Sequence, residues 1–520
     1  MRHFVPHNLL VFQLWWGGVV STPATMKAKS LCYMLAATAV AGSAGAQDAS
    51  GYLDTSWGWE PAFLEIVEVP VSLQRGISPQ EQMARRHAGV PTGQHLLSQA
   101  RNRDEDTSKG PCSGWRFLPD TPQRFMPYLD MLFVPGNTCA EPGAWIKEDA
   151  LSTGAQRMKT LLSRYGLQYD LTASYNYTAI HPKPHGHRSE FSSFNWALTG
   201  TWFLAKDCDN SQGVFLTFEA DWGTGTNFSE RRSSAGRSLG SLSNPQGSLR
   251  GGKGVTLPQL ALGYSGFDGK WVAMAGTLDL SNYLDQNAYA SSWAGGLMNE
   301  SFGSNPCLPL TWANLGFMTA WQPCESFYAM YATTSTNTGL NENPFNDLST
   351  NYWVHIGEIG FIREDVLGMG PGTYRLQYTI TDHDGQAGTG CGLNIQQQLG
   401  KNSNVGFFTR AGYMDQDAAR ITGVKCAATA GLMLRSPFRN SGWGSSSNYE
   451  NVSFGFLWQR AASSEKPLKH HDEYGLELST VWQVTPTFFL QPDVQYIFNP
   501  VHATDKDGAF VLQMQGVLKF

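Results

Sequence analysis

The strongest constraint on the fold is a period of two that runs through most of the chain after residue 166. In the closing segment 508–520, Phe510, Leu512 and Met514 fall on one side, and Gln513 and Gln515 on the other. Because side chains alternate along a strand, this segment has one apolar and one mostly polar face. A strand of a soluble sandwich and a strand of a membrane barrel both fit such a pattern.

Sixteen alternating segments can be marked between residue 167 and the C-terminus. Each is near the roughly 9–11 residues that a tilted strand needs to cross a bilayer. The segments are 167–178, 193–205, 213–222, 257–265, 270–279, 312–322, 326–334, 352–361, 372–381, 391–399, 404–413, 425–435, 451–459, 474–484, 487–498 and 508–520.

The connections between these segments alternate in length. Long connections such as 223–256 and 280–311 take turns with short ones such as 323–325, and 362–371 and 436–450 are the longer exceptions. A barrel with both ends in the periplasm has long external loops and short periplasmic turns, whereas a sandwich has no reason to sort its loops. We predict an all-β fold, a 16-stranded antiparallel transmembrane β-barrel with a short N-terminal helix and an irregular N-terminal extension. The loops 223–256 and 280–311 are the longest, and either is able to fold inward and narrow a pore.

The composition agrees with a barrel and excludes other classes. Charged residues make up 15 % of the 520 residues, below the roughly 25 % of soluble domains. No run of about 18 apolar residues occurs, so we expect no membrane-spanning helix. The net charge of −6 excludes a strongly basic nucleic-acid binder.

The N-terminal part divides into two regions before the barrel. Residues 1–46 are predicted to be a signal segment that starts at Met26, with Lys27 and Lys29 before an apolar stretch and a cleavage site before Gln47. Residues 1–25 are then a mis-assigned start or a long leader. Residues 47–150 are expected to form a periplasmic extension. A helical pattern within 149–166 ends at Gly166 and leads into the barrel domain, 151–520.

Seven cysteines follow the signal segment, an odd number, at 112, 139, 208, 307, 324, 391 and 426. Cys112 and Cys139 are one plausible pair. Cys391 and Cys426 are separated by a whole strand, about 9.5 Å against the roughly 7 Å limit for a disulfide, so they pair only if the loops close over that strand. Residues 307 and 324 are expected on opposite membrane sides and not to bond.

Charged residues inside the strand segments are the candidate pore-lining and sugar-contacting groups. Arg375 and Arg410 are expected to face the lumen, because a lipid-facing arginine costs about 2–4 kcal/mol at mid-bilayer. The same argument turns Glu358, Glu477 and Asp493 inward. Such groups can exchange hydrogen bonds with sugar hydroxyls, or they can simply keep the lumen wet.

Two further motifs allow an alternative to a pore. Glu219 and Asp221 share one strand face, which suits either two lumen-facing carboxylates or the paired acids of a glycosidase. The three histidines of HPKPHGH, 181–187, fit a solvated external loop better than a metal site. We expect no metal and no cofactor.

Several segments resemble the OprB family of carbohydrate-selective porins. The stretch YGLELSTVWQVTPTFFLQPDVQYIFNP, 474–500, is the most specific, with its core at 491–500. Weaker pieces are GLNIQQQLGKNSNVGFFTRAGY (392–413), GLMLRSPFRNSGW (431–443), LDLSNYLDQNAYA (278–290) and SRYGLQYDLTASYNYT (163–178). The Trp-Gly-Gly usual in the family near the first helix is absent, and Ser152-Thr153-Gly154 stands there, which leaves a plugging role of that helix open.

The resemblance implies a monomer-forming outer-membrane barrel, not an enzyme, that lets mono- and oligosaccharides diffuse into the periplasm. The alternatives are a general or anion-selective porin and, less favoured, an outer-membrane or secreted hydrolase. The expected partners are carbohydrates, outer-membrane lipid and a barrel-assembly machinery that grips the terminal Phe520. The oligomeric state stays open.

Overall fold

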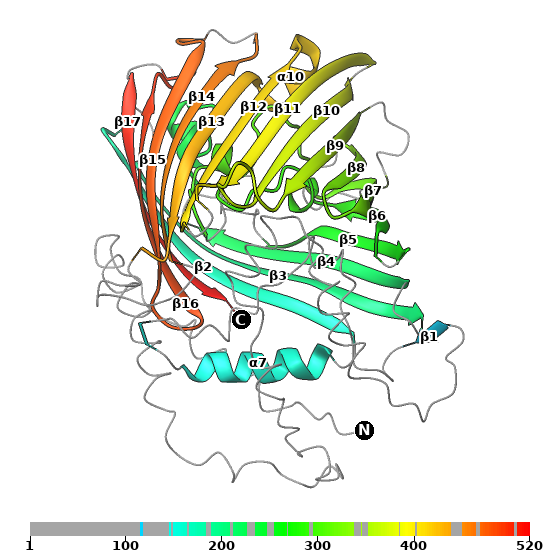
Figure 1. Ribbon diagram of the computed structural model, residues 1–520. Coiled ribbons are helices and arrows are strands. Elements are labelled where there is room, and N and C mark those ends of the chain that lie inside the picture. The colour runs from blue at the N-terminus through cyan, green and yellow to red at the C-terminus, as the bar shows by residue number, and fades with distance from the viewer. Residues whose placement is uncertain are drawn as a thin grey trace, which may run out of the picture. The chain divides into compact units, whose positions relative to one another are not determined.

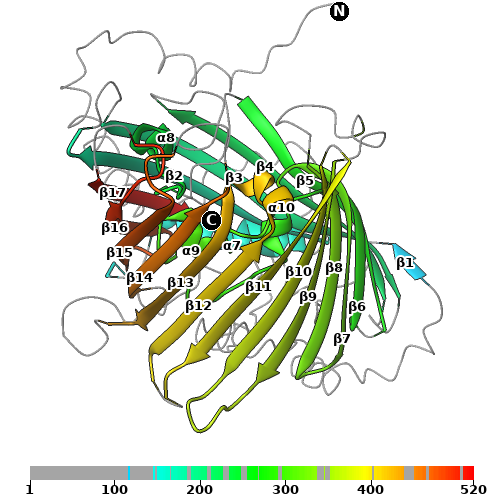
Figure 2. The ribbon, with the colours of Figure 1, turned by 90° about the horizontal axis from the view of Figure 1, so that it is seen from above.

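The computed structural model describes residues 115–117, 145–146, 149–163, 166–183, 189–207, 212–225, 234–246, 254–267, 269–290, 295–336, 345, 352–383, 385–400, 403–437, 450–463, 468–503 and 507–519. Sixteen strands form a ring, drawn in Figures 1 and 2. They are β2 (Leu167–His181), β3 (Glu190–Asp207), β4 (Gly213–Gly225), β5 (Gly254–Gly266), β6 (Trp271–Leu278), β7 (Asn314–Cys324), β8 (Phe327–Ser335), β9 (Trp353–Arg363), β10 (Gly372–His383), β11 (Gln386–Gln398), β12 (Val405–Met414), β13 (Val424–Arg435), β14 (Asn451–Ala461), β15 (Asp472–Gln483), β16 (Phe488–Phe498) and β17 (Gly508–Lys519).

The ring is closed by the pairing of its first and last strands. β17 runs antiparallel to β2 from Phe510 opposite His181 to Lys519 opposite Thr172. Every other strand of the ring pairs antiparallel with its neighbours in the sequence, β9 with β10 included. The predicted all-β, 16-stranded closed barrel is therefore confirmed. The predicted segments coincide with the strands to within a few residues, because period two is a local property of each segment.

The two faces of the wall differ as the sequence pattern requires. On β10, Leu376 and Tyr378 point outward and are about half exposed, whereas Arg375 and Gln377 are buried inside. The exposed apolar side chains recur around the ring and include Trp202, Leu257, Leu262, Trp321, Tyr331, Phe361, Leu376, Tyr413, Leu432, Phe454, Leu476, Phe498, Phe510 and Leu512. The outer wall thus carries an apolar belt.

Short helices sit in the connections. α7 (Ala150–Ser163) precedes β2, and Lys159 on it bonds to Asp170 at 2.5 Å. Gly166 after it has φ 88°, a conformation that glycine adopts without strain, which explains the end of the helical pattern there. The others are α8 (Ser234–Leu239), η6 (Leu280–Asn282), α9 (Glu300–Gly303) and α10 (Gln416–Thr422). None of the described helices is both long and apolar enough to span a membrane.

Two parts of the N-terminal region contact the barrel at the end where β17 finishes. β1 (Trp115–Phe117) pairs with the end of β3, which runs past the start of β2. Trp145 stacks on Trp482 with ring centroids 6.0 Å apart, and its indole N–H donates to Glu450 at 2.8 Å. The described part of the extension therefore contains a short strand that the sequence pattern did not reveal. The signal segment and the other residues of 47–144 lie outside the described residues.

The described cysteines are all free thiols, at 307, 324, 391 and 426. Cys391 and Cys426 each stand opposite Tyr413 of β12, one on either side, so a whole strand separates them. The alternative in which loops bring them together is not realised. Cys112, Cys139 and Cys208 lie outside the described residues.

Candidate functional site inside the barrel

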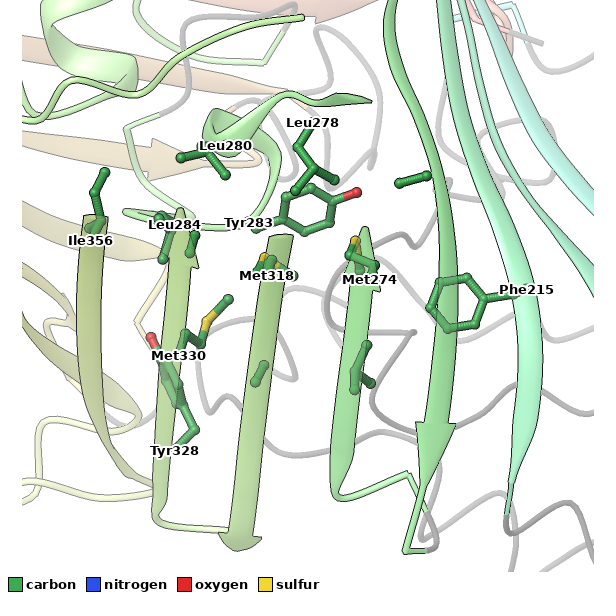
Figure 3. Close-up of a cluster of buried hydrophobic side chains, with 14 of the residues drawn as sticks. Phe215, Met274, Leu278, Leu280, Tyr283, Leu284, Met318, Tyr328, Met330 and Ile356 are labelled. Carbon is green, nitrogen blue, oxygen red and sulfur yellow. The ribbon is translucent and has the colours of Figure 1, made fainter. Parts of the chain in front are cut away.

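The long connection between β6 and β7 runs along the inner wall. Its first turn packs Leu280, Tyr283 and Leu284 onto Met318 and Ile356 of the strands below, all almost fully buried (Figure 3). Full burial of such a side chain stabilises the folded state by roughly 1.5–3 kcal/mol. An apolar cluster inside the barrel is therefore the first support of this inward loop, called the loop 279–313 below and described at residues 279–290 and 295–313.

Further along, glycines in the wall make room for the loop. A Cβ on Gly406 of β12 would overlap the ring of Tyr289, and one on Gly455 of β14 would lie 2.7 Å from ring carbons of Phe302. Only glycine permits so close an approach. Figure 2 shows α9, which contains Phe302, inside the ring of strands.

Arg410 of β12 is the centre of the contacts between loop and wall. Its Nε donates to Asp285 Oδ2 at 2.8 Å, and both side chains are fully buried. One Nη2 N–H reaches the Asp285 carbonyl at 2.9 Å, and the other the Gly303 carbonyl at 3.1 Å. Nη1 donates to the carbonyls of Phe302 and Ala290. The loop, rather than an open lumen, is thus the immediate neighbour of this guanidinium.

Glu358 and Arg375 form the adjoining part of the same network. Glu358 on β9 accepts the Asp285 N–H at 2.9 Å, the Tyr328 hydroxyl at 2.8 Å and the Gln377 amide at 2.8 Å. Arg375 on β10 donates from Nε to the Tyr328 hydroxyl at 2.9 Å. A buried carboxylate is tolerated because each oxygen has donors.

A second inward loop, residues 234–246 between β4 and β5, lies against strands β15 to β17. Its Pro245 carbonyl accepts the amides of Gln495 at 2.8 Å and Gln513 at 2.6 Å. Those two amides also donate to Asp493 Oδ1 at 3.0 and 3.2 Å. Asp493 therefore orients the two glutamines that hold this loop.

The remaining candidates also face inward. Glu477 accepts the backbone N–H groups of Met298 and Asn299. Glu219 accepts the Asn282 amide at 2.8 Å, and Asp221, two residues on, is 1 % exposed. All seven charged candidates face inward, and four of them, Arg410, Glu358, Glu477 and Glu219, bond directly to the loop 279–313. A direct contact with sugar stays a prediction, and Phe520 lies outside the described residues.

Sequence reasoning missed several residues of this site. Asp285 was not singled out, although it lies within the stretch 278–290 that carries the family resemblance. Arg435 was missed too, and its guanidinium lies over the ring of Tyr289 at 4.5 Å. Burial raises the pKa of Tyr289 to about 12, against the lowering effect of Arg435, so this phenol is neutral at physiological pH.

Comparison with known proteins bears on this arrangement. The family model described as carbohydrate-selective porin, OprB family, matches residues 384–520, which hold β11 to β17. The resemblance read from the sequence is thereby confirmed. Together with the barrel fold, the match indicates a channel rather than an enzyme. A search of the curated proteins gave no match.

A solved porin structure shares the fold. A high-pH structure of Pseudomonas putida OprB matches with a TM-score of 0.55 and 17 % identity, over 73 % of this chain and 99 % of that chain. The low-pH structure of the same protein matches with a TM-score of 0.43 and 16 % identity, over 71 % of this chain and 97 % of that chain. A mutant of the Rh. blastica porin matches with a TM-score of 0.45 and 9 % identity, over 68 % of this chain and 100 % of that chain.

Proposed function

We propose that the chain is an outer-membrane porin through which carbohydrates diffuse passively into the periplasm. The observation that carries the proposal is the family match over residues 384–520, which covers β11 to β17 and with them Arg410, Glu477 and Gln495 of the contacts with the inward loops. The OprB resemblance supplies the sugar preference. The barrel supplies the path, and the loops inside it supply a constriction that filters by size and by polar contacts.

The outer wall supports a place in the membrane. Exposed Leu, Phe, Tyr and Trp side chains recur on the strands around the ring, and the charged candidates all point the other way. Such a surface suits a lipid environment, because apolar area of this extent is unfavourable in water. On this proposal the apolar belt is in contact with outer-membrane lipid, and the end of the barrel that carries Lys519 faces the periplasm.

The route to the membrane follows from the same proposal. Export would use the signal segment 1–46, and residues 47–150 would stay in the periplasm as an extension of the barrel domain, 151–520. The contacts of Trp115–Phe117 and Trp145 at the periplasmic end support that placement. Insertion would use a barrel-assembly machinery that engages the closing strand at Phe520.

Liposome swelling with purified protein tests the function. We expect rapid swelling with glucose and with short oligosaccharides. We also expect the ratio of sugar flux to salt flux to be higher than that of a general porin. Equal permeation of sugars and salts of the same size would favour the general porin. Release of reducing ends from an oligosaccharide without swelling would favour the hydrolase, and its Glu219 and Asp221 pair would then be the first to substitute.

A further inference from the structure

Two buried glutamates on one strand each hold a different inward loop. Glu473 and Glu477 lie four residues apart on β15, face inward and are 0 % and 1 % exposed. Glu473 accepts the backbone N–H groups of Leu242 and Ser243, both at 2.9 Å, and the Ser241 hydroxyl at 2.7 Å. It therefore binds the loop 234–246.

Glu477 repeats this arrangement for the loop 279–313. It accepts the successive N–H groups of Met298 and Asn299, the latter at 3.1 Å. In both cases a carboxylate receives adjacent backbone donors, with both of its oxygens used. A buried backbone N–H that loses its acceptor oxygen costs about 1–3 kcal/mol.

The two loops are also bonded to each other beside these carboxylates. The Glu300 N–H donates to the Asn244 carbonyl at 2.9 Å, and the Asn244 amide donates to the Glu300 carboxylate at 2.9 Å. The Asn299 amide reaches Gln495 at 3.2 Å, and Gln495 in turn donates to Pro245. Each loop is thus connected to the other by direct bonds and through a shared wall residue.

We propose that Glu473 and Glu477 are positioning residues that fix both inward loops as one body and thereby set the width of the channel. The inference rests on the proposed function, since width matters only if solute passes. It predicts that loosening either loop loosens the other.

Glu473→Gln and Glu477→Gln test it with little change of shape. A glutamine has one acceptor oxygen and places an NH2 group against a backbone N–H, so at least one bond is lost. We expect the population of released loop to rise about ten- to hundred-fold, measured by hydrogen exchange of peptides covering 241–246 and 297–303. In Glu473→Gln, exchange should rise in both peptides. Swelling with maltohexaose should increase relative to glucose.

Asp472→Asn is the matched control, because it removes a carboxylate from the neighbouring position of the same strand. Asp472 bonds to Arg460 and Trp458 rather than to either loop. It should leave exchange and size selectivity as in the wild type. If the glutamine variants do not fold, as judged by heat-modifiable migration, Ser241→Ala tests the Glu473 bond from the loop side, and Asn244→Ala tests the bond between the two loops.

The outcomes separate the inference from the function on which it rests. Wild-type protein that forms no sugar-permeable channel contradicts the proposed function. Folded variants that keep the wild-type size selectivity, or that exchange faster in one loop alone, overturn the one-body inference while leaving the channel intact.

Discussion

Replacing Arg410 with alanine should release the inward loop 279–313 from the wall while leaving the barrel closed. The substitution leaves Asp285 buried without its guanidinium partner and deprives the carbonyls of Ala290, Phe302 and Gly303 of a donor. Breaking a buried pair from one side typically costs about 3–5 kcal/mol. The strand hydrogen bonds of β12 are backbone bonds and persist.

This cost falls on the loop equilibrium. At about 1.4 kcal/mol for each tenfold change, 3–5 kcal/mol raises the released population of the loop by roughly two to four orders of magnitude. Hydrogen exchange of peptides covering 285–305 should accelerate, and those from β2 and β3 should not. In planar bilayers the current through the variant should be larger and noisier, with a weaker block by sugar.

Two further variants make the test specific. Arg460→Ala removes an arginine on the outer face. The side chains of Arg460 and its partner Asp472 are 50 % and 26 % exposed, so the loss of this ion pair should lower the free energy of unfolding by no more than about 1 kcal/mol. In the Arg410→Ala/Asp285→Ala double variant the unpaired charge is gone, so exchange should be slower than in the single variant. If folded Arg410→Ala protein shows wild-type hydrogen exchange in the loop and wild-type current, then Arg410 does not hold the loop against the wall.

Further predictions concern the pore, its assembly and its thiols. Reversal potentials should show cation preference, because the inward carboxylates Glu219, Asp221, Asp285, Glu358, Glu473, Glu477 and Asp493 outnumber Arg375, Arg410 and Arg435, and a measured anion preference would contradict this. Arg375→Ala should weaken sugar block of the current, and an unchanged block would remove it as a sugar contact. Deleting Phe520 should lower the heat-modifiable fraction in outer membranes, whereas Lys519→Ala should not; equal yields would argue against a terminal assembly signal. Non-reducing mass spectrometry should find Cys391 and Cys426 as free thiols, and a bridge between them would contradict the register.

The barrel was predictable because its information is local. On the closing strand, Leu512 and Gln513 lie on opposite faces, and the same contrast recurs on β10 between Leu376 and Gln377. The inward position of Arg410 was predictable as well, since a lipid-facing arginine is costly. Both conclusions require only the residues next to the position in the sequence and the cost of placing a charge in lipid.

The partners of the inward residues were not predictable, because they are distant in sequence. Arg410 and Asp285 are 125 residues apart, and Glu473 is 230 residues from Ser243. Glu473 itself lies at a strand start among polar neighbours, where nothing marks it as buried. Inward glycines such as Gly406 and Gly455 were the available signal, because a wall position without a side chain leaves room for a loop.

The hydrogen-bond inventory of the two arginines separates their roles. A guanidinium has five N–H donors, and those of Arg410 meet Asp285 twice and the carbonyls of Ala290, Phe302 and Gly303. No donor is left for a sugar hydroxyl unless the loop leaves. Among the described residues, Arg375 donates to Tyr328 and Gln396 from two of its nitrogens. The expectation of a direct sugar contact therefore shifts to Arg375, while Arg410 acts on sugars through the loop that it holds.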